Sequence, residues 1–449
     1  MTIVPDGLRT ALHGALAPRR TGRVTRLVGL RLEVEGIEAA VGDAVRIWRG
    51  AGTLDAEVIA VQGAAVACMH LGELTGVRFG DTVESLGRPL PLVVGEGLLG
   101  RVLDGLGRPI DGGPSLTTWE EVSVDAAPPH PLRRDLVDRQ LALGVRAMDT
   151  LVPCGRGQRL GIFAGSGVGK SSLLSMIARG TDAAVSVLAL VGERGREVNE
   201  FIQRDLGPDG LARSVVVVAT SDEPALVRIR AAFTATRIAE WFRDQGMDVV
   251  LMMDSLTRFA MAQREVGLSA GEPPATRGYP PSVFSLLPKL LERAGAGEVG
   301  SITGLYTILV EGDDMNEPIA DAARSILDGH VVLSRKLATS GHFPSIDVLE
   351  SISRVEPAIT TPAQRAQARE VRKLLAAYRD ARDLIEIGAY VTGANPLVDR
   401  AVRLRESLDQ FLQQDVAYTV PAATSWAELA AVVAGDAEST AGLLGAVLA

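Results

Sequence analysis

A glycine-rich segment that ends in a lysine and two serines is the first place where residue types and spacing could do chemistry. Glycines let backbone N–H groups turn toward phosphate oxygens, and the N-terminus of a following helix adds positive charge. Lys170 would reach the β and γ phosphates, and the Ser171 hydroxyl would bind Mg²⁺. The strict pattern has glycine at its first position, where this chain has alanine. The segment is Ala164-Gly165-Ser166-Gly167-Val168-Gly169-Lys170-Ser171-Ser172.

Lysine is rare in this chain, which makes its place in that segment informative. It occurs at four positions, so arginine supplies 42 of the 46 basic residues. The alternative is a glycine-rich turn with a lysine by chance, but an apolar run before it and a helical pattern after it match a phosphate site. A second glycine pattern, Gly95 to Gly100, fits the dinucleotide fingerprint. We reject it because Gly105, Gly107 and Pro109 follow too closely for a helix.

Two carboxylates follow apolar, β-branched runs and are candidates for metal binding and catalysis. Asp254 directly follows the apolar run Val249–Met253. A carboxylate at the end of such a strand, beside a phosphate loop, is the usual second anchor for Mg²⁺. The alternative role for Asp254 is a helix N-cap. Glu193 could orient and polarise the water that attacks a phosphate. Its alternative is a structural ion pair with Arg194 or Arg196.

The runs that would position these groups lie between about residues 92 and 360 and alternate with helical stretches. Buried runs of this kind argue for a mostly parallel, doubly wound α/β sheet, in which ligands bind at the carboxyl ends of strands. A long helix over Arg228–Gln245 precedes the fourth run. The runs are Arg159–Phe163, Val185–Val191, Val215–Ala219, Val249–Met253 and Leu305–Val310.

The segments on either side have different periods. From Thr21 to Pro91 apolar residues alternate with polar ones between regular glycines, which predicts a small β-barrel or sandwich. From about Thr361 two helical apolar stripes, the first from Val371 to Ile385 and the second from Leu397 to Phe411, predict a C-terminal helical domain. An amphipathic helix over residues 7–17 could pack on its own barrel or dock a partner. The predicted parts are 1–20, 21–91, 92–360 and 361–449.

Composition excludes several classes of protein. The chain has 449 residues, enough for about three domains, with 47% hydrophobic and 22% charged residues, so it folds. A net charge of −9 and 4% aromatic residues disfavour nucleic acid as the main partner. Two cysteines are too few for a disulfide framework and suit the cytosol. We see neither a membrane-spanning run nor a signal peptide.

At this point the chain resembles a known family over residues from about 20 to 420. The phosphate loop and four other motifs look like the rotary ATP synthase catalytic superfamily, and most like its flagellar type III export ATPases. The other motifs are Gly192-Glu-Arg-Gly-Arg-Glu197, Glu272-Pro-Pro-Ala-Thr-Arg-Gly-Tyr-Pro-Pro281, Leu290-Leu-Glu-Arg-Ala-Gly295 and Val310-Glu-Gly-Asp-Asp-Met-Asn-Glu-Pro-Ile-Ala-Asp321.

The resemblance implies roles for particular residues. It implies a β-barrel, a RecA-like ATPase domain and a helical domain, in a homohexameric ring with ATP and Mg²⁺ between subunits. Glu193 would be the catalytic carboxylate, and Lys170 and Arg194 would also be catalytic residues. Arg354 would be an arginine finger inserted from the neighbouring subunit. Phe343 would lie against the adenine, core packing being its alternative, and Tyr418 would be a second aromatic neighbour.

At two places the chain differs from the motifs of related subfamilies, and these differences indicate which subfamily it resembles most. Gly388–Asp399 stands where the catalytic synthase subunit has an acidic lever segment, so a torque-generating subunit is disfavoured. Gly165-Ser166 after Ala164 differs from the Ala-Ser-Ala common in injectisome relatives, which favours flagellar export over virulence secretion. Two further functions compete with these: a nucleotide-binding structural subunit without catalysis, and an RNA translocase resembling termination factor Rho.

The resemblance also implies partners and a location. The N-terminal helix would dock a regulatory subunit of the export apparatus. Export gate and stalk proteins, export substrates and their chaperones would be further partners. The expected location is the cytoplasmic face of the inner membrane, reached through those partners because the chain has no span of its own.

Overall fold

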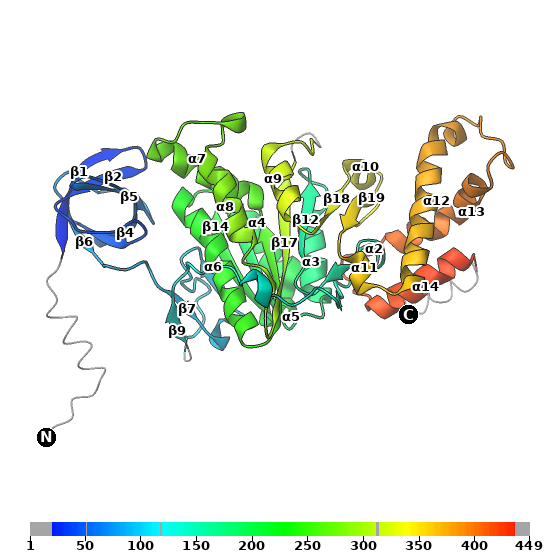
Figure 1. Ribbon diagram of the computed structural model, residues 1–449, viewed down its shortest axis with the longest axis horizontal. Coiled ribbons are helices and arrows are strands. Elements are labelled where there is room, and N and C mark those ends of the chain that lie inside the picture. Colours follow the sequence, from blue (N-terminus) through cyan, green and yellow to red (C-terminus); the bar gives the residue numbers. More distant parts are fainter. Residues whose placement is uncertain (1–19, 51, 117–118, 311–313, 436–449) are drawn as a thin grey trace, which may run out of the picture. The chain divides into compact units, whose positions relative to one another are not determined.

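The computed structural model describes residues 20–50, 52–116, 119–310 and 314–435 (Figure 1). Two compact units divide the chain. One contains the residues up to Pro91 together with 223–227 and 265–273, and the other contains the remainder. The predicted helix at residues 7–17 lies outside the described residues. The domain boundaries at residues 20, 91 and 360 stay predictions; the C-terminal helices and the large sheet belong to one compact unit.

Six short antiparallel strands close into the predicted barrel in the order β1-β2-β5-β4-β3-β6. Alternation places every second side chain inside, so Leu32, Val34, Val45, Ile47 and Val58 are fully buried. The strands are β1 (Thr21–Val28), β2 (Arg31–Glu35), β3 (Ala44–Arg49), β4 (Gly52–Gln62), β5 (Ala65–His70) and β6 (Thr82–Ser85).

A nine-stranded sheet forms the centre of the second unit (Figure 1). Its main order is β19-β18-β12-β17-β15-β13-β14-β8, and β16 pairs with β17. All neighbours are parallel except β18 with β19 and β16 with β17. The strands are β8 (Val102–Asp104), β12 (Arg159–Ala164), β13 (Val185–Glu193), β14 (Ser214–Thr220), β15 (Asp248–Asp254), β16 (Gly295–Ala296), β17 (Ser301–Leu309), β18 (Gly329–Leu333) and β19 (Ile346–Ser353).

The mostly parallel sheet confirms the predicted fold class, with corrections in detail. β17 begins at Ser301, four residues before the predicted run, because its first residues mix polar and apolar types. Strands β8, β18 and β19 were not predicted. They are edge or near-edge strands without a long apolar run. The Gly95–Gly100 segment contains only a three-residue 3-10 helix, Glu96–Leu98, as its following glycines require.

Helices and small sheets complete this part of the chain. The predicted long helix is α6, displaced by three residues at its start. The helices are α2 (Arg146–Leu151), α3 (Lys170–Gly180), α4 (Gly195–Glu200), α5 (Gly207–Ala212), α6 (Ala225–Asp244), α7 (Leu256–Ala270), α8 (Pro281–Leu291), α9 (Pro318–Ile326), α10 (Arg335–Thr339) and α11 (Glu356–Ile359). Two-stranded sheets pair β7 (Leu92–Val94) with β9 (Glu120–Val122) and β10 (Gln140–Leu141) with β11 (Cys154–Gly155).

Three helices follow the sheet and confirm the helical C-terminal region: α12 (Pro362–Glu386), α13 (Pro396–Leu412) and α14 (Ala422–Ala434). Thr361 begins α12 with a reciprocal capping box to Gln364. Val371 and Phe411 are fully buried in the core shared with the sheet. Leu397, predicted in the second stripe, is 39% exposed because it lies in the first turn of α13, beside the loop.

None of the helices in the described ranges combines the length and the apolar character that crossing a membrane requires.

Candidate active site

The glycine-rich segment joins the carboxyl end of β12 to the start of α3, as the motif predicts. Gly167 and Gly169 have φ of 74° and 91°, values that favour glycine. Gly169 is the residue before α3, and no side chain caps the helix there. Backbone N–H groups at this helix N-terminus are therefore available to an anion. Gly165, Ser166, Val168 and Ser172 are the other residues of the loop and first turn, and the Ser171 side chain lies at the surface.

The alanine at the first position of the motif is accommodated by the core. Ala164 is fully buried in the hydrophobic cluster beneath the loop, and its carbonyl accepts the Val310 N–H at 3.1 Å. Its methyl group therefore packs into the protein.

Two side chains that the sequence analysis missed hold the loop from outside. The Ser345 hydroxyl donates to the Val168 carbonyl at 2.6 Å, and the Arg335 guanidinium donates to the Ser166 carbonyl at 3.2 Å. Ser345 lies two residues after Phe343. The expectation that Phe343 contacts the adenine was the one indication in the sequence that this segment approaches the loop.

Three charged side chains meet at the carboxyl edge of the sheet. Lys170 starts α3 after β12, Glu193 ends β13, and Asp254 ends β15. The Lys170 ammonium donates to Asp254 Oδ1 and lies 3.5 Å from Glu193 Oε1. All three side chains are largely buried, with 13%, 15% and 6% of the lysine, glutamate and aspartate side chains exposed. The structure thus brings together three of the predicted site residues.

Burial and charge together set the protonation of this cluster. Burial by itself lowers the pKa of Lys170, but the charges of Asp254 and Glu193 outweigh it, and the pKa is raised above its ordinary value. Burial raises the pKa of Glu193, and Lys170 opposes this shift. The lysine therefore stays charged while the glutamate is easier to protonate than a glutamate in water.

Asp254 is not a helix cap, which was the alternative for it. Ser255 caps α7 instead, because its hydroxyl accepts the Arg258 N–H at 3.3 Å at the start of that helix. Asp254 Oδ1 instead accepts a hydrogen bond from the Thr307 hydroxyl at 2.8 Å. Lys170 and Thr307 are the two side-chain donors to Asp254 among the described residues, and both bind Oδ1. Within those residues, no side chain donates to Oδ2.

The alternative for Glu193, a pairing with Arg194 or Arg196, is wrong. Arg194 forms an ion pair with Glu197 at 3.3 Å, and Arg196 forms one with Glu200 at 2.8 Å. Arg194 has 76% of its side chain exposed, so the structure does not bring its guanidinium into the lysine–carboxylate cluster. The arginine whose charge acts on Glu193 is Arg258, which adds to the effect of Lys170 and lowers the pKa of Glu193 against the larger rise from burial. Sequence reasoning did not single out Arg258.

Of the two predicted aromatic neighbours, Phe343 lies beside the glycine-rich loop. A Cβ placed on Gly169 would be 3.4 Å from the Phe343 ring, and Phe343 is 41% exposed, which disagrees with core packing. Tyr418 is 37% exposed. Buried Gln414 links the two segments, because its backbone N–H donates to the Phe343 carbonyl at 2.9 Å and its side chain donates to the Tyr418 carbonyl at 2.8 Å.

Arg354 lies at the opposite edge of the sheet. β19 runs antiparallel to β18, from the carboxyl edge at Ile346 to the amino edge at Ser353, and Arg354 follows directly. Its guanidinium is exposed and donates to the Arg324 carbonyl at 3.4 Å. A six-residue strand such as β12 spans on the order of 20 Å, so Arg354 cannot reach Lys170 of its own chain.

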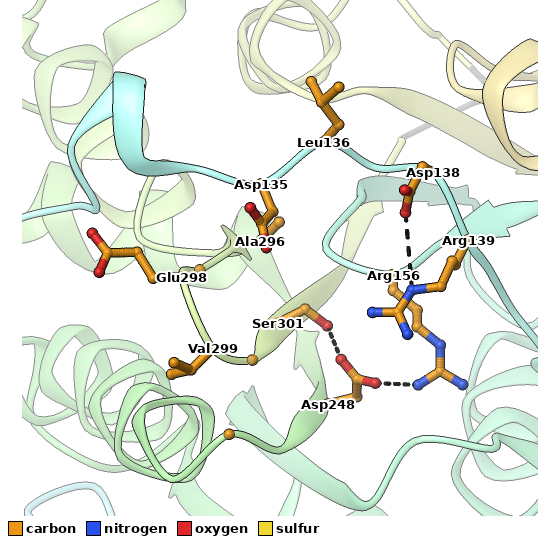
Figure 2. Close-up of a pocket in the computed structure, with 13 residues that line it drawn as sticks. Asp135, Leu136, Asp138, Arg139, Arg156, Asp248, Ala296, Glu298, Val299 and Ser301 are labelled. Carbon is orange, nitrogen blue, oxygen red and sulfur yellow. Dashed lines mark hydrogen bonds and ion pairs between the residues drawn. The ribbon is translucent and has the colours of Figure 1, made fainter.

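A cavity of about 600 Å³ also lies at the amino edge (Figure 2). Asp248 starts β15 and Ser301 starts β17, and both line it. Asp248 accepts from the Ser301 hydroxyl at 2.6 Å and pairs with Arg156 (Figure 2). None of the predicted site residues lines this cavity, so it is separate from the lysine–carboxylate cluster.

Comparisons with known proteins agree with this geometry. A family model described as the ATP synthase alpha/beta family, nucleotide-binding domain, matches residues 144–353, and one described as the T3SS EscN ATPase C-terminal domain matches residues 360–431. A flagellum-specific ATP synthase of Bacillus subtilis is 51% identical over 88% of this chain and 91% of its own length. A type 3 secretion system ATPase of Xanthomonas euvesicatoria is 49% identical over 91% and 93%.

Solved structures extend the likeness to the fold. The assembled ATPase EscN of the enteropathogenic Escherichia coli type III secretion system has a TM-score of 0.87, with 47% identity over 92% of this chain and all of the EscN chain. EscN in complex with its central stalk EscO has a TM-score of 0.85, with 46% identity over the same shares of both chains.

Proposed function

Because the chain belongs to the ATP synthase alpha/beta family, among the flagellar and type III secretion ATPases, we propose that its lysine–carboxylate cluster hydrolyses ATP to drive flagellar protein export. The chain is an ATP-hydrolysing enzyme, and its substrate is a nucleotide. The observation that carries the assignment of the site is the meeting of Lys170, Glu193 and Asp254 beside an uncapped glycine-rich helix start.

Phosphate binding follows from the loop and its lysine. The amides at the start of α3 would hold the β and γ phosphates, and Lys170 would exchange its contact with Asp254 for phosphate oxygens. The charges of Asp254 and Glu193 raise the pKa of Lys170, and the negative phosphates would replace the charge of Asp254, so the lysine would stay charged through this exchange. Phe343 and Tyr418 would contact the adenine, since Phe343 lies beside the loop and Gln414 joins its segment to that of Tyr418.

A Mg²⁺ ion fits the oxygen atoms at this edge. The exposed Ser171 hydroxyl and Oδ2 of Asp254, which accepts from no side chain among the described residues, are hard oxygen ligands of the kind that Mg²⁺ takes, directly or through water. Bound there with ATP, the ion would neutralise charge on the phosphates. Within the described residues no group of three or more His, Cys, Asp and Glu side chains could hold a metal. Phosphate oxygens and water would complete the coordination, as is usual for Mg²⁺.

Hydrolysis needs a group that orients water, and we assign this to Glu193. When Lys170 moves to the phosphates, the Glu193 carboxylate loses a counter-charge and can accept a hydrogen bond from water. Arg194 is assigned no contact with the reacting atoms, since its guanidinium pairs with Glu197.

We also propose a homohexameric ring with the site shared between subunits. Arg354 is exposed at the sheet edge away from its own Lys170, so it can serve as an arginine finger only for another subunit. The assembled state of EscN, a relative with 47% identity, supports self-association.

Flagellar export is the first candidate process and injectisome secretion the second. The curated relatives include flagellar proteins at 51% and 50% identity and a secretion ATPase at 49%, so overall similarity does not separate the two. Gly165-Ser166 in the phosphate loop favours the flagellar assignment. Restored motility in a flagellar ATPase mutant expressing this chain would support it, whereas rescue of effector secretion alone would favour the injectisome.

A stalk protein is the partner that the structure supports best. The last turn of α12 and the loop before α13 expose Leu384, Ile387 and Val391, which are 50%, 75% and 71% exposed. An apolar surface therefore stands where the synthase subunit has an acidic lever. EscN has been solved with its central stalk EscO. Docking of a regulatory subunit through residues 7–17, and contacts with the export gate, substrates, chaperones and inner membrane, are further parts of the proposal.

Phosphate release by the purified chain tests the enzymatic part. We expect Mg²⁺-dependent release that rises more than linearly with protein concentration, because each site needs two subunits, and that RNA does not stimulate. Glu193→Gln should slow release by at least about 10² but keep nucleotide binding. Linear concentration dependence would contradict the shared site, and stimulation by RNA would favour a Rho-like translocase.

A further inference from the structure

One hydroxyl group beside the proposed metal ligand has no role in what has been described so far. Thr307 lies on β17, the strand between β12 with its phosphate loop and β15 with Asp254. It is fully buried, and its Oγ1 lies 2.8 Å from Asp254 Oδ1 and 3.3 Å from the Met253 carbonyl. A hydroxyl donates one hydrogen, and the shorter, charge-assisted contact to the carboxylate takes it.

The register of the parallel strands fixes this contact. Tyr306 on β17 pairs with Met253 on β15, so the next residues, Thr307 and Asp254, are neighbours at the carboxyl edge. The contact therefore does not depend on a flexible loop.

A second threonine on the same strand shows what a purely structural hydroxyl does here. Thr303 is 1% exposed, and its Oγ1 accepts the Gly157 N–H at 2.9 Å. It lies four residues before Thr307, about 13 Å away along the strand. Thr303 satisfies a buried backbone donor at the amino edge, whereas Thr307 donates to an ionisable group at the site.

We propose that Thr307 is a positioning residue that holds Asp254 Oδ1 so that Oδ2 faces the nucleotide-bound divalent cation. The inference rests on the proposed function, since it assigns Asp254 to the metal. Before nucleotide binds, Lys170 and Thr307 both donate to Oδ1. Once Lys170 turns to the phosphates, Thr307 is the side-chain donor that remains among those described, and it keeps the carboxylate from rotating.

The cost of losing this donor would appear in metal affinity. Asp254 is 5% exposed, so water cannot readily replace the hydroxyl, and a buried acceptor that loses its partner is costly. Partners of metal ligands typically contribute a factor of roughly 10 to 100 in affinity or activity. Because much of the ion's coordination comes from phosphate oxygens, we expect the lower end, about tenfold.

The experiment compares Thr307→Val with Thr307→Ser, and with Thr303→Val as the matched control on the same strand. Mn²⁺ binding to the protein with a non-hydrolysable ATP analogue is followed by electron paramagnetic resonance, and the Mg²⁺ dependence of phosphate release is measured beside it. Thr307→Val should weaken Mn²⁺ binding about tenfold and shift half-maximal Mg²⁺ equally. Analogue affinity in EDTA should be unchanged. Thr307→Ser and Thr303→Val should resemble the unsubstituted chain.

The outcomes separate the inference from the proposed function. Unchanged Mn²⁺ binding in Thr307→Val, or equal loss in Thr303→Val, overturns the positioning role while leaving the ATPase site intact. If the unsubstituted chain binds no Mn²⁺–nucleotide, the metal assignment fails first. Should Thr307→Val not fold, as judged by thermal melting, Thr307→Ala takes its place with the same expected shift and the same criterion.

Discussion

Lys170 Nζ lies 3.5 Å from Oε1 of Glu193, so the loop lysine neutralises the carboxylate proposed to orient water. Removing that carboxylate should separate binding from hydrolysis. In Glu193→Gln we expect turnover to fall by at least about 10². Affinity for ATP should stay equal or rise, because Lys170 no longer has to give up an ion pair with Glu193 when it binds the phosphates. Turnover and equilibrium binding of an ATP analogue check this. Hydrolysis at the normal rate would show that another group orients the water.

The raised pKa of Glu193 predicts a particular acid limit of activity. Burial raises this pKa above its ordinary value of 4.5, and only the ionised carboxylate accepts a hydrogen bond from water. As pH falls through the raised pKa, the group is protonated and kcat/KM declines, so the decline begins at a higher pH than for a glutamate in water. A kcat/KM profile between pH 4 and 9 tests it. Thermal melts at each pH exclude unfolding as the cause.

Arg354 should act on the site of another subunit. Arg354→Ala should leave ATP binding intact and slow turnover by roughly 10³ to 10⁵, the range for arginine fingers. The sharper test mixes inactive Arg354→Ala and Glu193→Gln chains before assembly. Mixed rings contain sites with an intact Glu193 from one chain and an intact Arg354 from the next, so part of the activity should return. If mixing restores nothing, Arg354 does not serve a neighbouring subunit's site.

Phe343 should contribute to nucleotide affinity with little effect on chemistry. Stacking on a base contributes about 1–3 kcal/mol, so Phe343→Ala should raise KM for ATP about tenfold or more at nearly constant kcat. Phe79→Ala, which removes an aromatic ring that is 82% exposed in the β-barrel unit, is the control. A KM that does not change would argue that the ring does not touch the base.

Asp149 predicts how stability depends on pH. It is fully buried on α2, where its oxygens accept the N–H groups of Leu143 and Gly144 at 2.8 and 3.0 Å. Burial raises its pKa from 3.8 to about 7, with the two N–H donors opposing. The folded chain therefore keeps a proton that the unfolded chain has lost, and stability falls as pH rises from about 4 toward 7.

The loss of stability caused by Asp149 can be estimated, and Asp149→Asn serves as its control. The rise of this pKa from 3.8 to about 7 corresponds to on the order of 4 kcal/mol of stability lost as pH rises across that range. Asp149→Asn cannot titrate, and one of its two side-chain atoms cannot accept an N–H, so it should be less stable at pH 5 by about 1–3 kcal/mol. Its stability should then vary less with pH than that of the unsubstituted chain. Denaturant unfolding at pH 5 and pH 8 measures both effects, and equal slopes for the two chains would contradict the assignment.

Local pattern was sufficient for most of the fold and for three residues of the site. The motif around Lys170 and the apolar runs ending near Glu193 and Asp254 place all three at strand ends, and parallel strands bring such ends to one edge. The barrel and the C-terminal helices follow equally from periodicity. The strands β18 and β19, at one side of the sheet, escaped prediction because polar residues interrupt their apolar ones, and local pattern cannot distinguish such segments from loops.

By itself, then, the sequence determined the type of site, its phosphate loop and its carboxylates, because these depend on residue types within a few positions of each other. Only the tertiary structure decided which side chains meet across long separations. Thr307 reaches Asp254 over 53 residues, Ser345 reaches Val168 over 177, and Arg354 is carried to the far edge of the sheet. Strand order and register create these relationships, and both result from packing the whole sheet, which no local segment encodes.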